Sequence, residues 1–209
     1  MQVPSTSPHC GTRIIQSEHN NLSAVINGMK YFVDSIAKGQ PAPDLKVFRA
    51  MLFYIDEFPD RVHHPKEERY LFARLRNRTT ELDATLTELG HQHEQGTTLV
   101  RNLEHALLRY EFEGALAFPV FRRLVDEYAK FYFSHMRLEE KEVLPAAARF
   151  FTQEDWAEID SAFAANADPL NLLSAKDSFE KLFSLIANIT PTPIGLGPEV
   201  RSQWTDSAL

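Results

Sequence analysis

Apolar residues recur every three or four positions along most of the chain, which is the period of an amphipathic helix. Four such stretches predict helices over about 12–38, 44–77, 80–112 and 118–145. Glycine and proline fall between these stretches, where they would end one helix and begin the next. We expect Pro59 and Pro65 to kink or interrupt the second helix, and Pro145 to mark the end of the fourth.

Four long helices with short links predict an all-α fold, an up-down-up-down four-helix bundle over residues 12–147. Residues 149–209 should form a C-terminal helical extension that packs on or near the bundle. A helix-start signal at Thr152 predicts a short helix to about Ala165. A second helix is predicted over 174–189, and the Pro/Gly-rich tail after it cannot be helical.

Six polar residues occupy the apolar faces of the four predicted helices: His19, His63, Glu67, His93, His135 and Glu139. A buried polar side chain costs free energy unless it is paired or binds a metal. His63 and Glu67 are four residues apart, as are the last two residues of the set, so each pair projects from one helix face. Four imidazoles and two carboxylates are the donors expected of a two-metal centre in a bundle.

An internal repeat strengthens this prediction. The segment HHPKEERYLF begins at His63, and the similar HMRLEEKEVL begins at His135. Matching ligands in the two halves are 74, 72 and 72 residues apart, which predicts a pseudo-two-fold axis through the centre. The alignment pairs His64 with Met136, so we place His64 off the ligand face, although distortion at Pro65 leaves it as an alternative ligand.

Four other side chains near or outside the pattern receive simpler interpretations. We expect Glu68 and Glu140 to be solvated or hydrogen-bonded behind the ligands. His9 and His105 fall outside the repeat and are predicted to be surface residues.

The six-residue pattern resembles that of hemerythrin-like proteins of the HHE cation-binding group, in particular bacterial members. The resemblance covers about residues 12–147. It implies two iron ions per chain with an oxo or hydroxo bridge between them. His19 and His63 would hold one iron, His93 and His135 the other, and Glu67 and Glu139 would bridge both. Manganese and zinc also suit these donors.

One position departs from the oxygen-carrying members, which have a fifth histidine one turn after the third ligand. That position is Thr97 here, and the nearby His91 should face away from the site. The resulting centre is more open and could admit O₂, nitric oxide or peroxide. We therefore predict a di-iron protein that binds or senses such a ligand. The alternatives are an enzyme that disproportionates peroxide or reduces nitric oxide, and an iron-responsive interaction protein.

Composition limits the partners and the cellular location that we expect for this protein. The 209 residues carry a net charge of −7, which argues against a nucleic-acid partner. A single cysteine, Cys10, excludes an intramolecular disulfide and a cysteine metal cage. The sequence shows neither a membrane-spanning apolar run nor a start typical of a signal peptide, so we expect a cytoplasmic protein without a membrane partner. The sequence does not show whether the protein has a redox partner or forms a homodimer.

Overall fold

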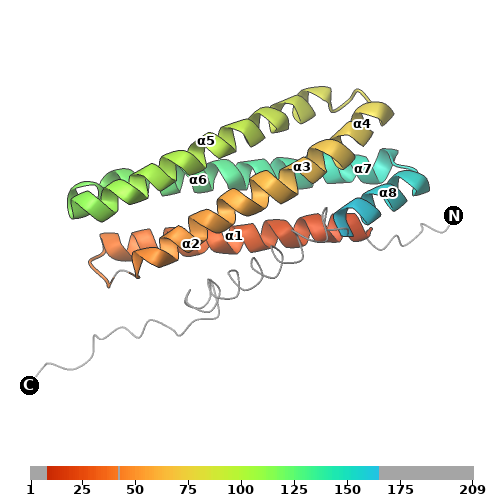
Figure 1. Cartoon of the computed structure of the whole chain (residues 1–209). Coiled ribbons are helices and arrows are strands. Elements are labelled where there is room, and N and C mark those ends of the chain that lie inside the picture. The colour runs from red at the N-terminus through yellow and green to blue at the C-terminus, as the bar shows by residue number, and fades with distance from the viewer. Residues whose placement is uncertain (1–8, 42, 165–209) are drawn as a thin grey trace, which may run out of the picture.

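The computed structural model describes residues 9–41 and 43–164 of the chain. Four long helices lie side by side in it (Figure 1). The first is α1 (Cys10–Ala37) and the third is α5 (Asp83–Glu113), which the short η3 (Gly114–Leu116) follows. The second helix consists of consecutive segments: α2 (Leu45–Ile55), η1 (Asp56–His63), α3 (His64–Lys66), η2 (Glu67–Phe72) and α4 (Ala73–Arg78). The fourth consists of α6 (Phe118–Leu138), η4 (Glu139–Val143) and α7 (Leu144–Phe150), and α8 (Gln153–Ala164) comes after it.

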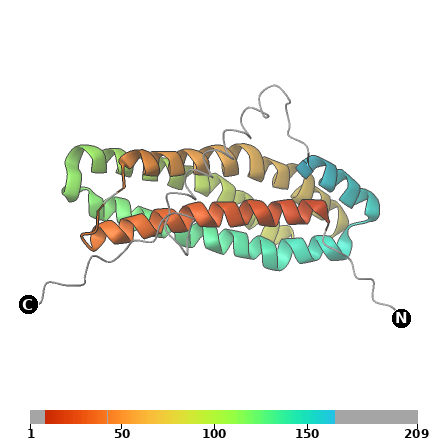
Figure 2. The same cartoon turned by 90° about the horizontal axis from the view of Figure 1, so that it is seen from below.

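The four long helices close into a bundle. Helix α1 contacts α2 and α6, and α5 contacts the same two helices from the other side. Successive helices are joined by short connections and run in opposite directions, as both views show (Figure 2). This arrangement confirms the predicted all-α, hemerythrin-like four-helix fold, and the described residues contain no strand. None of the helices among them is long and apolar enough to cross a membrane.

The prolines change the helices without breaking them. The prediction that the fourth helix ends near Pro145 is wrong, because the helix continues to Phe150. A proline lacks an N–H and clashes with the carbonyl four residues before it. Wider π-helical turns lie next to these prolines, and their bonds span five residues: the backbone N–H of Leu144 donates to Glu139, and that of His64 donates to Pro59. The extra width accommodates each ring while the helix keeps its direction.

Two apolar clusters fill the bundle, one on each side of a polar layer. The larger cluster contains Leu22, Val100 and Tyr132, and the smaller one contains Ile15 and Leu89. The predicted ligand His19 lies between Ile15 and Leu22 in the sequence, and His93 lies between Leu89 and Val100. The six candidate ligands therefore form a polar layer sealed by hydrophobic packing above and below.

Helix α8 packs against α1 and η2 (Figure 1). The predicted capping interaction forms at its start: the Asp155 N–H donates to Thr152 Oγ1, and the Thr152 N–H donates to Asp155 Oδ2. The buried Asp155 carboxylate also accepts two hydrogen bonds from Arg78, at 2.7 and 2.8 Å. The second predicted helix of the extension, over 174–189, and the Pro/Gly-rich tail lie outside the described residues.

Candidate metal centre

The structure brings all six predicted ligands into one buried layer at the middle of the bundle, and none is more than 8% exposed. They form two groups in which the donor atoms lie within 4.8 Å of one another. The first group contains His19 and His63, and the second contains His93 and His135. Glu67 and Glu139 belong to both groups. We call the place between the donors of the first group the first metal position, and its counterpart in the second group the second metal position.

Each shared carboxylate presents one oxygen to each position. Glu67 Oε1 lies 3.3 Å from His63 Nε2, while its Oε2 lies 3.7 Å from His93 Nε2. Glu139 has the mirrored arrangement: its Oε2 lies 3.2 Å from His19 Nε2 and its Oε1 lies 3.4 Å from His135 Nε2. Both side chains therefore have the orientation of carboxylates that bridge two metals.

Several inward-facing donor atoms lack a hydrogen-bond partner in the described structure. These are both carboxylate oxygens of Glu67 and of Glu139, and Nε2 of His93 and of His135. Buried polar atoms are rarely left unpaired, because each costs about 1–3 kcal/mol. At the first position, the Nε2 atoms of His19 and His63 approach to 3.2 Å, as two ligands of one ion do. This donor set fits two metal ions.

The outer nitrogen of each ligand histidine faces an oxygen acceptor from a neighbouring helix. Four residues, which we call the outer acceptors, provide these oxygens: Glu140 to His19 at 3.0 Å, Glu18 to His63 at 2.8 Å, Glu68 to His93 at 3.1 Å and Gln92 to His135 at 3.0 Å. A carboxylate only accepts, so the Nδ1 atoms opposite Glu18, Glu68 and Glu140 carry the proton and donate. The Nε2 lone pairs are then free for a metal, which is the usual arrangement behind metal-bound histidines.

The outer acceptors follow the same repeat as the ligands. Glu18 and Gln92 each precede a ligand histidine and are 74 residues apart, while Glu68 and Glu140 each follow a bridging glutamate and are 72 apart. The prediction that Glu68 and Glu140 lie behind the ligands holds in the structure. Sequence reasoning missed Glu18 and Gln92, although their 74-residue spacing was a signal that could have identified them.

A comparison with protein families agrees with this geometry. The profile described as hemerythrin HHE cation binding domain matches residues 10–147. The chain belongs to this family. A comparison with curated proteins gives no match to the chain. Membership of the HHE family indicates cation binding, and the two overlapping groups of buried donors are where this chain could hold the ions.

Protons compete with metal ions for the donors of the HHE centre, and the individual donors differ in how tightly they hold a proton. Burial alone lowers the pKa of His19 and of His93, but the nearby carboxylates of Glu139 and of an outer acceptor outweigh burial and raise both values to about 9. Burial lowers the pKa of His135 to about 4. Burial, with the charge of Glu139, raises the pKa of Glu67. Metal binding must displace protons from this layer.

His64 does not lie where the sequence predicted it. The prediction that it lies off the ligand face is wrong, because its side chain is buried and its ring stacks on that of His93 with centroids 3.9 Å apart. Consecutive residues of an α-helix point about 100° apart, so His63 and His64 should not both face inward in a regular helix. The π-helical turn η1 ends at His63 and changes the register of the helix at this point, and both rings face the polar layer.

A pocket of about 540 Å³ opens beside the second metal position. Asp60, His64, His93 and Thr97 contribute to its lining. Thr97 Oγ1 donates to Asp60 Oδ2 at 3.0 Å, so this residue faces the same region as His93, as expected from its spacing. His91 is exposed and also contributes to the lining of this pocket, whereas His105 is exposed on another part of the surface.

Proposed function

We propose that this HHE-family chain is a di-iron protein that binds or senses O₂, nitric oxide or peroxide at the six-ligand centre. The observation that supports this most is that two groups of buried donors share both Glu67 and Glu139, each with an oxygen directed to either position. Two iron ions bound there would supply redox-active sites for a small diatomic or peroxide ligand. Manganese and zinc fit the same donors and are tested below.

Residues of this chain would also orient the ligands, exclude bulk water and give a small molecule access to the site. The outer acceptors fix the tautomer and orientation of the four ligand imidazoles. The two apolar clusters exclude bulk water from both ends of the polar layer. The pocket lined by His93 and Thr97 gives a small molecule a route to the second position. We expect this function in the cytoplasm, in keeping with the chain's single cysteine.

A second candidate is an enzyme that disproportionates peroxide or reduces nitric oxide. The pocket favours this alternative, because a volume of about 540 Å³ exceeds what one diatomic molecule requires and allows product and substrate to exchange. An iron-responsive interaction protein is a third possibility from the sequence, but most of the extension on which it depends lies outside the described residues.

The test begins with elemental analysis of protein purified without added metal, followed by anaerobic loading with Fe²⁺. We expect two irons per chain and a change in the visible spectrum when O₂, nitric oxide or peroxide is added. The variant Glu67→Gln should lose this change, whereas His105→Ala should retain it. Saturation at one metal per chain or none would refute the proposal. Sustained O₂ release from peroxide would favour the enzyme, and a reversible spectral change without turnover would favour the binding protein.

A further inference from the structure

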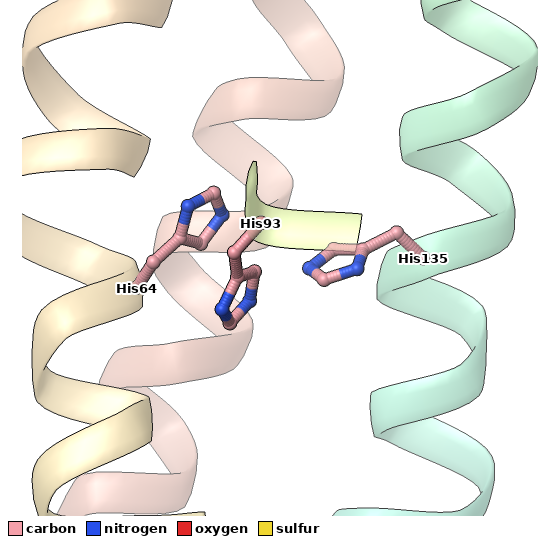
Figure 3. A group of neighbouring side chains, drawn as sticks. All are labelled: His64, His93 and His135. Carbon is pink, nitrogen blue, oxygen red and sulfur yellow. The ribbon is translucent and has the colours of Figure 1, made fainter. Parts of the chain in front are cut away.

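His64 belongs to a third group of buried donors that overlaps the second metal position. One ring nitrogen of His64 lies within 4.8 Å of a ring nitrogen of His93 and of His135. The three rings come from α3, α5 and α6 and point toward one another (Figure 3). Only 5% of His64 is exposed. Its imidazole is therefore buried in the polar layer, although it is not one of the six predicted ligands.

The outer nitrogen of His64 also faces a carboxylate, at a longer distance than the outer nitrogens of the ligand histidines and from the same helix. His64 Nδ1 lies 3.4 Å from Asp60 Oδ1, one helical turn earlier. Asp60 is itself held by the Thr97 hydroxyl, which donates to its other oxygen at 3.0 Å. With Nδ1 directed at a carboxylate, Nε2 is the nitrogen available to a metal. Thr97, which stands where oxygen carriers have their fifth histidine, thus helps to orient a histidine from a different helix.

The matching position in the other half of the bundle cannot provide such a ligand. Met136 is the counterpart of His64 in the repeat, and its sulfur accepts a hydrogen bond from Ser23 Oγ at 3.8 Å. A thioether is a soft donor that suits copper(I) better than the iron or manganese that imidazoles and carboxylates bind. An additional nitrogen is therefore present at the second position and absent at the first.

We propose that His64 Nε2 is a third histidine ligand of the metal at the second position, so that the two metals of the centre are held unequally. The first metal has His19, His63 and two bridging carboxylates, while the second has His64, His93, His135 and the same carboxylates. Tyr132, whose hydroxyl lies 3.3 Å from His64 Nε2, must turn away from that nitrogen when the metal binds. This inference rests on the proposed two-metal function.

The first experiment titrates the apoprotein with Co²⁺ without oxygen and follows binding by calorimetry. The variant His64→Met places the residue of the matching position at the second site, and Met136→Leu is the control. We expect the parent and Met136→Leu to bind two ions alike. His64→Met should bind one ion normally and the other about 100-fold more weakly. Loss of a residue behind a ligand already lowers metal affinity by up to about 100-fold, and loss of a ligand should cost no less. Free imidazole should restore affinity to His64→Ala.

Two results would overturn the inference while leaving the proposed function intact: two ions bound by His64→Met with both affinities within twofold of the parent, or no rescue of a weakened His64→Ala by imidazole. A parent chain that binds fewer than two ions would instead refute the proposed function itself.

A second measurement uses the unmodified chain and does not depend on the folding of a variant. Proton NMR of the fully Co²⁺-loaded protein shows the Nδ1 protons of metal-bound imidazoles as strongly shifted signals that disappear in D₂O. We expect five such signals, one for each of His19, His63, His64, His93 and His135. Four signals would show that His64 contacts the centre without binding a metal, and would refute the inference.

Discussion

The two halves of the bundle have the same ligands but different surroundings. The first half, α1 with the second helix, provides His19, His63 and Glu67, and the second half repeats this set. The surrounding residues are repeated less faithfully: Glu18 corresponds to Gln92, and His64 corresponds to Met136. The repeat therefore places two matching groups of candidate donors, and we propose that its departures make the two positions hold a metal unequally.

The departures affect the charge near each of the two metal positions. Both histidines of the first position donate to carboxylates, Glu18 and Glu140. At the second position, His93 faces the carboxylate of Glu68, but His135 faces the neutral amide oxygen of Gln92. A carboxylate behind an imidazole increases its basicity and its strength as a ligand. The first position has more negative charge behind its ligands, and the second has an additional imidazole beside it.

The largest expected effect comes from removing what the two halves share. Glu67→Gln and Glu139→Gln should each reduce metal content to less than one ion per chain, because each carboxylate presents an oxygen to both positions. Metal-free Glu67→Gln should be at least as stable as the metal-free parent, because burial disfavours the ionised Glu67 carboxylate and raises its pKa. Metal-free Glu139→Gln should be less stable, because the surrounding histidines hold the pKa of Glu139 well below its ordinary value and would lose their partner. Elemental analysis and urea unfolding measure the two effects, and the exposed Glu142→Gln is the control. Normal metal content in either variant would show that its carboxylate does not bridge.

Removing one histidine should separate the two positions. We expect His63→Ala and His135→Ala each to retain about one ion per chain, while the exposed His105→Ala retains two. Metal present at a hundredfold excess over Kd adds about 2.7 kcal/mol of stability. Loss of one ion should therefore lower the melting temperature of the loaded protein by about 5–10 °C in a chain of this size. Equal metal loss in all three variants would contradict the ligand assignment.

The first half is also the one to which α8 is tied, through Arg78 and Asp155. Asp155→Asn should lower the free energy of unfolding by about 2 kcal/mol at neutral pH, because this buried carboxylate accepts two charge-assisted hydrogen bonds. Glu158→Gln, which removes an exposed ion pair with Arg74, should cost less than about 1 kcal/mol. Urea unfolding of both variants measures the difference. Equal costs would show that the buried Arg78–Asp155 pair stabilises the fold no more than an exposed ion pair does.

This contribution should depend on pH. The hydrogen bonds from Arg78 hold the pKa of Asp155 at about 2, below its ordinary value of 3.8. A group whose pKa is lower in the folded protein stabilises the fold when it is ionised in both states. The stability difference between the parent and Asp155→Asn should be fully present above pH 5 and decrease as the pH falls from 4 toward 2. A stability difference that stays constant over this pH range would show that the pKa of Asp155 is not lowered in the folded protein.

The smallest expected effect comes from exchanging the outer acceptors between the halves. Gln92→Glu gives His135 a carboxylate like that behind His63 and should increase metal affinity at the second position by about tenfold. Glu18→Gln makes the reverse change and should lower affinity at the first position by a similar factor. Chelator competition measures both. If both substitutions left affinity unchanged, the outer acceptors would orient the rings without tuning them.

The sequence was sufficient for the fold and for the six residues that the structure brings together as candidate ligands, because both follow from helical periodicity. Apolar residues at steps of three and four gave four helices whose observed bounds differ from the predicted ones by a few residues, except at the end of the fourth. Glu67 and Glu139 were identifiable because each lies four residues after a histidine on a buried face. The 72-residue offset between them then indicated that they meet.

Only the tertiary structure could show that the His64 ring faces the polar layer and which histidine each outer acceptor contacts. The position of His64 follows the π-helical turn η1, which contains Pro59 and ends at His63. Such a turn changes the direction of the side chains after it and is not visible in a regular 3.6-residue period. Glu18 bonds to a histidine 45 residues away on another helix, and such a contact depends on how the helices pack. Sequence by itself determined which residues share a helix face, since that is local geometry. Packing decided which faces meet and which nitrogen of each ring faces inward, because those choices depend on contacts between distant segments.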